Sequence, residues 1–229
     1  TVVNDSTVEN AISNNKDICT SHVTNMSHGS FESFVPDTYT KDITHWDVSS
    51  VISMQYMFYS TSFNQDIGNW NTSKVNYMSR VFMHADSFNQ PIGSWDTSGV
   101  FDMGYMFYDA DSFNQDISGW NTSSVTNMGN MFGHTNLFNQ SIGGWDTHAV
   151  TNMKGMFRNV GDFNQDISNW DTSSVTDMSY MFYYVTIFNQ NISEWDVDNV
   201  TSCTKFNYVD TGANAWSSSY KPTFTKCTP

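Results

Sequence analysis

The sequence predicts an α/β solenoid in which each 25-residue repeat contributes one short parallel strand and one short helix, with a cap at both ends. Phenylalanine before Asn-Gln and a tryptophan seven residues later both recur in steps of 25 residues. Degenerate copies flank the regular ones. Such a unit cannot bury its apolar face alone, so copies stacked between two polar caps are expected. The phenylalanines are Phe63, Phe88, Phe113, Phe138, Phe163 and Phe188.

The repeat FNQDISNWDTSSVTDMSYMF, residues 163–182, carries a pattern for each element. Val175, Met178 and Phe182 have the spacing of one helix face, and the Asp-Thr-Ser-Ser before them offers helix N-caps. Alternation of apolar and polar residues in FNQDI predicts a strand of about five residues over 163–167. One strand and one short helix in 25 residues fall within the length range of leucine-rich repeats.

The repeats divide the chain into three segments. Residues 1–45 are expected to form an N-terminal cap with a degenerate first repeat, and residues 207–229 a C-terminal cap. Between them, residues 46–206 form a solenoid of about six to seven repeats. The copy that begins at Trp46 is one residue shorter than the others, because the next tryptophan is Trp70.

Charge excludes nucleic acid as a partner, and the lack of a long apolar run excludes membrane insertion. Nine basic residues against 23 acidic ones give a net charge of −14. A nucleic-acid surface needs clustered lysine and arginine, so no nucleic-acid partner is expected. No apolar run approaches the roughly 20 residues of a membrane span, so no direct membrane insertion of this chain is expected.

The three cysteines are Cys19, Cys203 and Cys227. A disulfide between Cys203 and Cys227 would close the irregular C-terminal tail and contribute about 3 kcal/mol in the chain-entropy model. The alternative is a reduced pair. Cys19 is left over in either case.

The repeats resemble those of a known family. The run Ile-x-x-Trp-Asp-x-Ser-x-Val-Thr-x-Met-x-x-Met-Phe, linked by Phe-Asn-Gln, is similar to the repeats of BspA-like leucine-rich-repeat bacterial surface proteins, over residues 18–206. The resemblance implies a right-handed stack, a secreted or surface-attached extracellular protein and, for some members, adhesion to host or matrix molecules. Methionine and aromatic residues stand here where ordinary leucine-rich repeats carry leucine, so ligand sites of ordinary repeats cannot be transferred.

The tryptophans and the methionines are expected to hold the stack. Each indole N–H should bond to a neighbouring turn, although parallel indoles would also suit a sugar-binding platform. Flexible methionine side chains on the inward helix face should fill gaps between repeats. The tryptophan ladder is Trp70, Trp95, Trp120, Trp145, Trp170 and Trp195.

An Asn-Gln pair also recurs in every regular repeat. Identity at six positions suggests that each asparagine bonds to the backbone of the next turn as a buried amide ladder. A ligand-facing polar stripe is the alternative. The asparagines are Asn64, Asn89, Asn114, Asn139, Asn164 and Asn189.

We expect no catalytic site, no metal site and no cofactor. The chain carries no phosphate-binding loop, no nucleophile elbow and no metal-ligand spacing. Asp109, Asp111 and Asp116 form an acidic cluster that calcium could use, but converging oxygens are not evident. His84 and His134 stand two repeats apart, about 10 Å, too far to share a metal, and are interpreted as solvated loop histidines.

The function predicted from these observations is an extracellular scaffold that binds or adheres to protein or glycan ligands at a cell surface or matrix. Exposed aromatic side chains in the variable loops are the expected ligand contacts. They are Tyr59, Tyr108, Tyr183 and Tyr184.

Two alternatives stay open. One is ice binding by ranks of threonine, and the other is a purely structural spacer in a larger surface protein. The first rank, in the expected helix-cap positions, is Thr72, Thr97, Thr122, Thr147 and Thr172. The second rank is Thr126, Thr151, Thr176 and Thr201.

Overall fold

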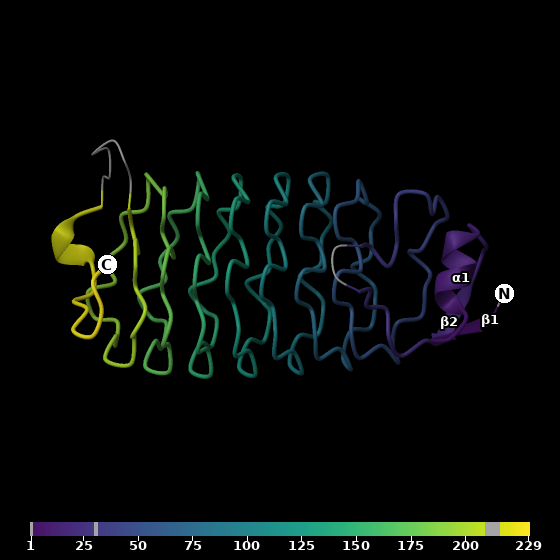
Figure 1. Ribbon diagram of the computed structural model, residues 1–229, viewed down its shortest axis with the longest axis horizontal. Helices are drawn as coiled ribbons and strands as arrows, with labels where there is room; N and C mark the ends of the chain where they lie inside the picture. Colours follow the sequence, from purple (N-terminus) through teal and green to yellow (C-terminus); the bar gives the residue numbers. More distant parts are fainter. Residues whose placement is uncertain (1, 30–31, 209–215) are drawn as a thin grey trace.

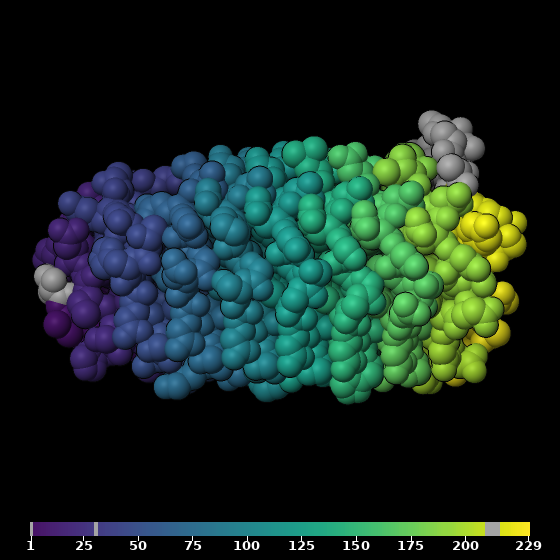
Figure 2. Space-filling model, turned by 180° about the vertical axis from the view of Figure 1, so that it is seen from behind, coloured from purple at the N-terminus to yellow at the C-terminus, as the bar shows by residue number. Residues whose placement is uncertain are grey.

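The repeats form successive coils of chain that lie side by side along the long axis of the molecule (Figure 1). The N-terminal elements lie at one end of this stack and the C-terminal residues at the other. Neighbouring coils are in contact along the length of the stack (Figure 2). The computed structural model describes residues 2–29, 32–208 and 216–229.

Helices and paired strands within the described ranges occur only near the chain ends. β1 and β2 pair in parallel, and α1 turns Val8, Ala11 and Ile12 into the core. The elements are β1 (Val2–Asn4), α1 (Val8–Ser13), β2 (Cys19–His22) and the 3-10 helix η1 (Ser218–Tyr220).

Within the repeats, parallel pairing is one residue wide. Thr126 N donates to the Phe101 carbonyl at 2.9 Å, and Met103 N donates to the Asn127 carbonyl at 3.0 Å. Such bridges join each coil to the next along one line of the stack, in the segment where the sequence pattern predicts the helix. The bridged residues are Asn25, Ser53, Tyr77, Asp102, Asn127, Asn152, Asp177 and Ser202.

A run of turns stands in place of the expected helix in the described repeats. In residues 103–109, Phe107 N donates to the Met131 carbonyl of the next coil at 2.9 Å. Tyr105 and Asp109 of this run each have a left-handed φ of 59°. A helix would keep these N–H groups inside its own coil. The left-handed residues instead let alternate N–H groups of this run donate to main-chain carbonyls of the next coil.

The strand expected over 163–167 is also not formed. Asn164 N donates to Asn139 Oδ1 at 3.1 Å, and Gln165 Nε2 donates to the same oxygen at 2.9 Å. A side-chain oxygen therefore takes the place that a main-chain carbonyl has in a β-ladder. The ladder expected from the sequence is therefore formed, but its burial was predicted wrongly, because these side chains are half-buried or exposed. The asparagines that accept in this way are Asn64, Asn89, Asn114, Asn139 and Asn164.

Columns of aromatic and methionine side chains fill the core. The Trp120 and Trp145 rings stack with centroids 6.4 Å apart, and Trp120 Nε1 donates to the Ile92 carbonyl at 3.0 Å. The indoles that make this bond to the preceding coil are Trp95, Trp120, Trp145, Trp170 and Trp195. Among the described residues, Trp46 and Trp70 have a buried Nε1 without a partner. These two tryptophans begin and end the shortened copy, and their rings still stack with centroids 6.5 Å apart.

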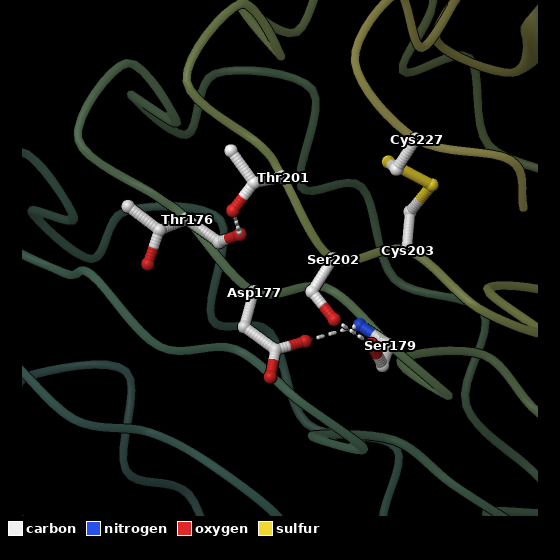
Figure 3. Close-up of a disulfide and its surroundings, with 7 residues drawn as sticks. All are labelled: Thr176, Asp177, Ser179, Thr201, Ser202, Cys203 and Cys227. Carbon is white, nitrogen blue, oxygen red and sulfur yellow. Dashed lines mark hydrogen bonds between the residues drawn. A yellow bond between two sulfur atoms is a disulfide. The ribbon is translucent and has the colours of Figure 1, made fainter.

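The C-terminal segment closes the other end of the stack. Trp216 is 4% exposed, and its Nε1 donates to the Gln190 carbonyl at 2.9 Å. The expected disulfide between Cys203 and Cys227 is present (Figure 3), and Cys19 is free and exposed. The expected cap at 207–229 includes residues 209–215, which lie outside the described residues.

Candidate functional site

Tyrosine, histidine and basic side chains gather along the runs of turns, where the sequence of each coil varies most. We call this surface the aromatic strip. Consecutive members contact one another from coil to coil, and His134 N donates to the Arg158 carbonyl at 2.7 Å, so they form one continuous surface. The members are Tyr56, Tyr59, Arg80, His84, Tyr105, Tyr108, His134, Arg158, Tyr180, Tyr183, Tyr184, Lys205 and Tyr208.

Arg80 occupies the N-terminal part of the strip. Its guanidinium carbon lies 5.4 Å from the Tyr56 ring centroid and 4.7 Å from that of Tyr105. Cation–π contacts of this length hold a guanidinium against aromatic rings without neutralising its charge. Arg80 is therefore a fixed positive charge on a partly exposed surface.

Tyr108 lies at the middle of the strip between two histidines. Its ring centroid is 5.7 Å from that of His84 and 5.1 Å from that of His134. A Cβ added to Gly133 would lie 2.8 Å from the Tyr108 ring, so a glycine is needed where this ring leans over the next coil. Burial raises the pKa of Tyr108, so its phenol is neutral at pH 7.

The two histidines differ in their partners. His84 Nδ1 lies 2.9 Å from a carboxylate oxygen of Asp109. Burial lowers the pKa of His134, the nearby positive charge of Arg158 lowers it further, and Asp109 opposes both. Both rings are only partly exposed and pack on Tyr108, so the interpretation of them as solvated loop histidines was wrong.

The C-terminal part of the strip holds the other two cations. Arg158 lies 5.7 Å from the Tyr180 ring centroid and 5.3 Å from that of Tyr183. Lys205 lies 5.6 Å from Tyr183 and 5.0 Å from Tyr208. Tyr183 therefore has a cation on two sides.

All four predicted contact residues lie in the aromatic strip. They are Tyr59, Tyr108, Tyr183 and Tyr184, and each is partly exposed. That they contact a ligand stays a prediction. Sequence reasoning missed Arg80, Arg158 and Lys205. A signal was available, because the chain has only two arginines and both fall in the same segment of their repeats.

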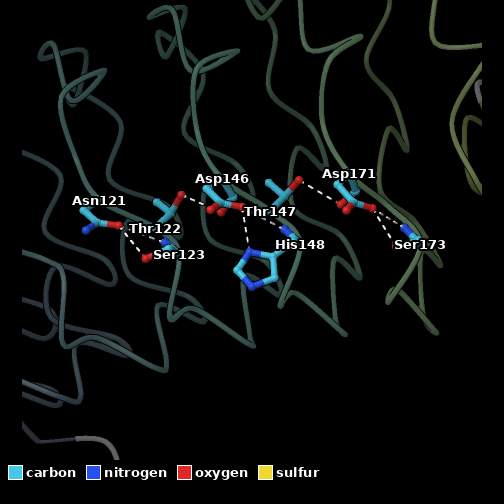
Figure 4. A network of polar contacts seen from close by, with 8 residues as sticks. All are labelled: Asn121, Thr122, Ser123, Asp146, Thr147, His148, Asp171 and Ser173. Carbon is cyan, nitrogen blue, oxygen red and sulfur yellow. Dashed lines mark hydrogen bonds and ion pairs between the residues drawn. The ribbon is translucent and has the colours of Figure 1, made fainter.

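The first threonine rank is buried, not displayed. Thr122 Oγ1 donates to the Asp146 carbonyl of the next coil at 2.8 Å, and Thr147 Oγ1 to the Asp171 carbonyl at 2.9 Å (Figure 4). Each of the five side chains is 1% exposed. The helix-cap assignment was wrong, because no helix follows and the hydroxyl donates to a carbonyl rather than accepting from an amide.

The second rank lies on the outside of the bridged segment. Thr126, Thr151, Thr176 and Thr201 are exposed. Their hydroxyls bond weakly to the preceding coil, as when Thr201 Oγ1 donates to the Thr176 carbonyl at 3.5 Å (Figure 3).

The acidic cluster does not converge on a cation. Asp109 pairs with His84, Asp111 accepts from Asn136 Nδ2 at 3.1 Å, and Asp116 accepts from Ser118 N at 2.9 Å. Within the described ranges, no three His, Cys, Asp or Glu side chains are placed to hold a metal ion.

A hollow of about 670 Å³ lies between α1 and the first coils. Its lining includes Glu9, His28, Asp37 and Tyr59. Tyr59 is the only member of the aromatic strip among the described residues that line it, so the hollow meets the strip at its N-terminal end.

Comparisons with known proteins place the chain in a family. Among the described residues, no helix is long and apolar enough to cross a membrane. Neither the curated proteins nor the solved structures gave a match. The model of one protein family matches twice, over residues 24–141 and 113–219. Because these matches cover most of the 229 residues, the chain belongs to the family described as Mycoplasma protein of unknown function, DUF285.

Proposed function

We propose that this protein is an extracellular binding module of the BspA-like type, a right-handed leucine-rich-repeat-like stack that uses the aromatic strip to hold a glycan or protein ligand. The observation that carries the proposal is the composition of the strip. In a chain with nine basic residues, three lie there against tyrosine rings. Tyrosine and arginine, together with tryptophan, are enriched among the residues that contribute most of the binding energy at interfaces.

The disulfide supports an extracellular location. Disulfides persist in oxidising surroundings and are rare in reducing ones. The bond between Cys203 and Cys227 ties the last repeat to the C-terminal segment. The excess of acidic residues argues against a nucleic-acid partner, as it does in the sequence alone.

The geometry of the strip favours an extended ligand over a small substrate. The strip spans seven coils, from Tyr56 to Tyr208. Tyrosine pairs recur in three of its coils, as Tyr56 with Tyr59, Tyr105 with Tyr108 and Tyr180 with Tyr183, so an extended ligand can make several weak contacts at once. We assign no reaction and no cofactor to it, and the absence of enzymatic activity stays a prediction.

Ice binding is a second candidate, favoured by one observation only. The four threonines from Thr126 to Thr201 form an exposed, regular rank. The other rank is buried, and Phe101 stands where the exposed rank would continue toward the N-terminus. A short rank offers little surface for a lattice. Arrest of ice recrystallisation by the folded protein, but not by heat-unfolded protein, would favour this candidate. A purely structural spacer is left if neither activity is found.

The proposal is tested by a binding screen against immobilised matrix proteins and glycans. We expect saturable binding by the wild type and at least a tenfold weaker affinity for Tyr108→Ala combined with Tyr183→Ala. The matched control is Tyr77→Ala combined with Phe101→Ala, which removes two exposed aromatic rings from the bridged segment. Equal binding by wild type and the strip variant, with both folded by circular dichroism, would remove the strip as the site.

A further inference from the structure

We propose that the ligand of the aromatic strip is a glycan that carries carboxylates, with Arg80 and Arg158 as the carboxylate-binding residues and Tyr105 and Tyr108 between them as platforms for the sugar rings. This inference rests on the proposed function and narrows it to one class of ligand.

Among the described residues, neither arginine forms an ion pair with a carboxylate. The chain has 23 acidic residues, so an arginine on its surface has many possible carboxylate partners. Within the part of the chain that the structure describes, the ion pairs all involve histidine: His28 with Glu32, His84 with Asp109 and His148 with Asp146. Both arginines instead pack on tyrosine rings. Their positive charges are therefore not neutralised by an ion pair within the described residues.

Hydrogen bonding at Arg158 also favours a carboxylate ligand. Arg158 Nε is buried and makes no hydrogen bond to any described residue. A buried donor without a partner is unfavourable. Because Nε itself is enclosed by protein, a ligand carboxylate would reach this guanidinium through its two terminal nitrogens. A guanidinium presents its donors in a planar fork that fits a carboxylate with two parallel bonds, whereas lysine is a point charge. The rings of Tyr180 and Tyr183 hold this fork at a fixed place before a ligand arrives.

The spacing of the two arginines suits a linear ligand. Arg80 and Arg158 stand three coils apart, which is about 15 Å for coils joined by parallel backbone hydrogen bonds. Tyr105 and Tyr108 lie between them, with ring centroids 5.5 Å apart. A linear sugar chain offers flat ring faces to such tyrosines and carries its carboxylates at intervals. An acidic peptide has the charges but lacks the flat rings.

The surroundings also limit the charge density of the ligand. Asp109 lies within the strip region beside His84, and the net charge of the whole chain is −14. These charges repel a densely sulfated polymer more than a chain with one carboxylate on every second sugar. The strip is therefore suited to a sparsely charged acidic glycan.

The experiment measures affinity by isothermal titration for four probes of matched length: hyaluronan, heparin, dextran and polyglutamate. Hyaluronan carries one carboxylate per two sugars, heparin adds dense sulfate, dextran is neutral and polyglutamate is an acidic peptide. We expect hyaluronan to bind most tightly. Arg80→Gln and Arg158→Gln should each weaken its binding at least tenfold. The control Lys74→Gln removes one exposed positive charge outside the strip and should change binding less than twofold.

Each other outcome overturns the assignment. Equal affinity for dextran would show that the carboxylates of the ligand do not contribute to binding. The tyrosine platform of the proposed function would still stand. Tighter binding of heparin would assign the arginines to sulfate, and tighter binding of polyglutamate would assign them to a protein partner. If the wild type binds none of the four probes but still binds a ligand in the screen of matrix proteins, the acidic glycan is rejected and the proposed binding function is kept. If a glutamine variant unfolds, Arg158→Lys tests the same point, because lysine keeps the positive charge and lacks the planar fork of donors. Unchanged affinity of this variant for hyaluronan would contradict the assignment of Arg158 as a carboxylate-binding residue.

Discussion

Threonine has two different roles in the repeats at the scale of single residues. Thr122 is 1% exposed, and its hydroxyl donates to the Asp146 carbonyl at 2.8 Å. Thr126, four positions later, is exposed, and its hydroxyl donates to the Phe101 carbonyl at 3.2 Å. A buried bond between coils leaves an unpaired carbonyl when it is removed, whereas water can replace an exposed one.

Thr122→Val should therefore destabilise the protein and Thr126→Val should not. Valine keeps the shape of threonine but leaves the Asp146 carbonyl without its donor. We expect the free energy of unfolding to fall by about 1–2 kcal/mol for Thr122→Val and by less than about 0.5 kcal/mol for Thr126→Val. Urea denaturation followed by tryptophan fluorescence measures both. Equal stability of the two variants would contradict a structural role for the buried rank.

At the scale of the element, the sequence predicts which side chains face inward better than it predicts the backbone that carries them. Val125, Met128 and Phe132 have the spacing of a helix face, and all three are buried. A run of turns satisfies the same spacing, so the spacing alone could not distinguish the two. The left-handed conformation of Asn130 and His134 distinguishes them, because a helix excludes it.

The asparagine ladder shows the same limit. Identity at six positions led to the expectation of a bond to the next coil, and Asn139 Oδ1 does accept from Asn164 N. The strand assigned to that segment was nevertheless not formed, since a side-chain oxygen supplies the acceptor. Alternation of apolar and polar residues reports which side chains face inward, not whether main-chain groups pair with each other.

Asn139 provides a test of this substitution of side chain for backbone. Asn139→Leu removes the acceptor for both Asn164 N and Gln165 Nε2, so we expect the free energy of unfolding to fall by about 1–3 kcal/mol. Asn139→Asp keeps an oxygen in the same place and should retain most of the stability at pH 7. Thermal unfolding by circular dichroism distinguishes the two. A leucine variant as stable as the aspartate variant would show that the ladder contributes nothing.

The candidate site could be predicted in part, and the reason lies at the scale of the whole molecule. The sequence predicts Tyr59, Tyr108, Tyr183 and Tyr184 as contact residues because they are aromatic residues in variable loops. Arg80 could not be assigned a role in the same way, because its contacts come from Tyr56 and Tyr105, one coil away on either side. A residue whose role depends on the coils before and after it is not identified from its own repeat.

Charge acts at the same scale, through aspartates that recur at the turn before the buried threonines. Hydrogen bonds from the Ser98 side chain and backbone lower the pKa of Asp96, and Ser173 does the same for Asp171. A carboxylate with a lowered folded pKa contributes stability that is complete above its ordinary value of 3.8. That contribution is lost as the pH falls through the folded value.

We therefore expect the thermal midpoint to fall as the pH decreases below about 4. At higher pH, a fall in pH has the opposite effect, because it relieves the repulsion within a chain of net charge −14. The thermal midpoint should therefore be greatest at a pH above about 4.

The double variant Asp96→Asn and Asp171→Asn separates the two effects. Asparagine keeps the turn, as Asn121 does where its Oδ1 accepts from Ser123 N at 3.1 Å (Figure 4). The variant should lose less stability between pH 4 and pH 2 than the wild type, because two of the groups that bind protons on unfolding are gone. An unchanged pH profile, measured by calorimetry, would show that these turn aspartates do not cause the acid sensitivity of the stack.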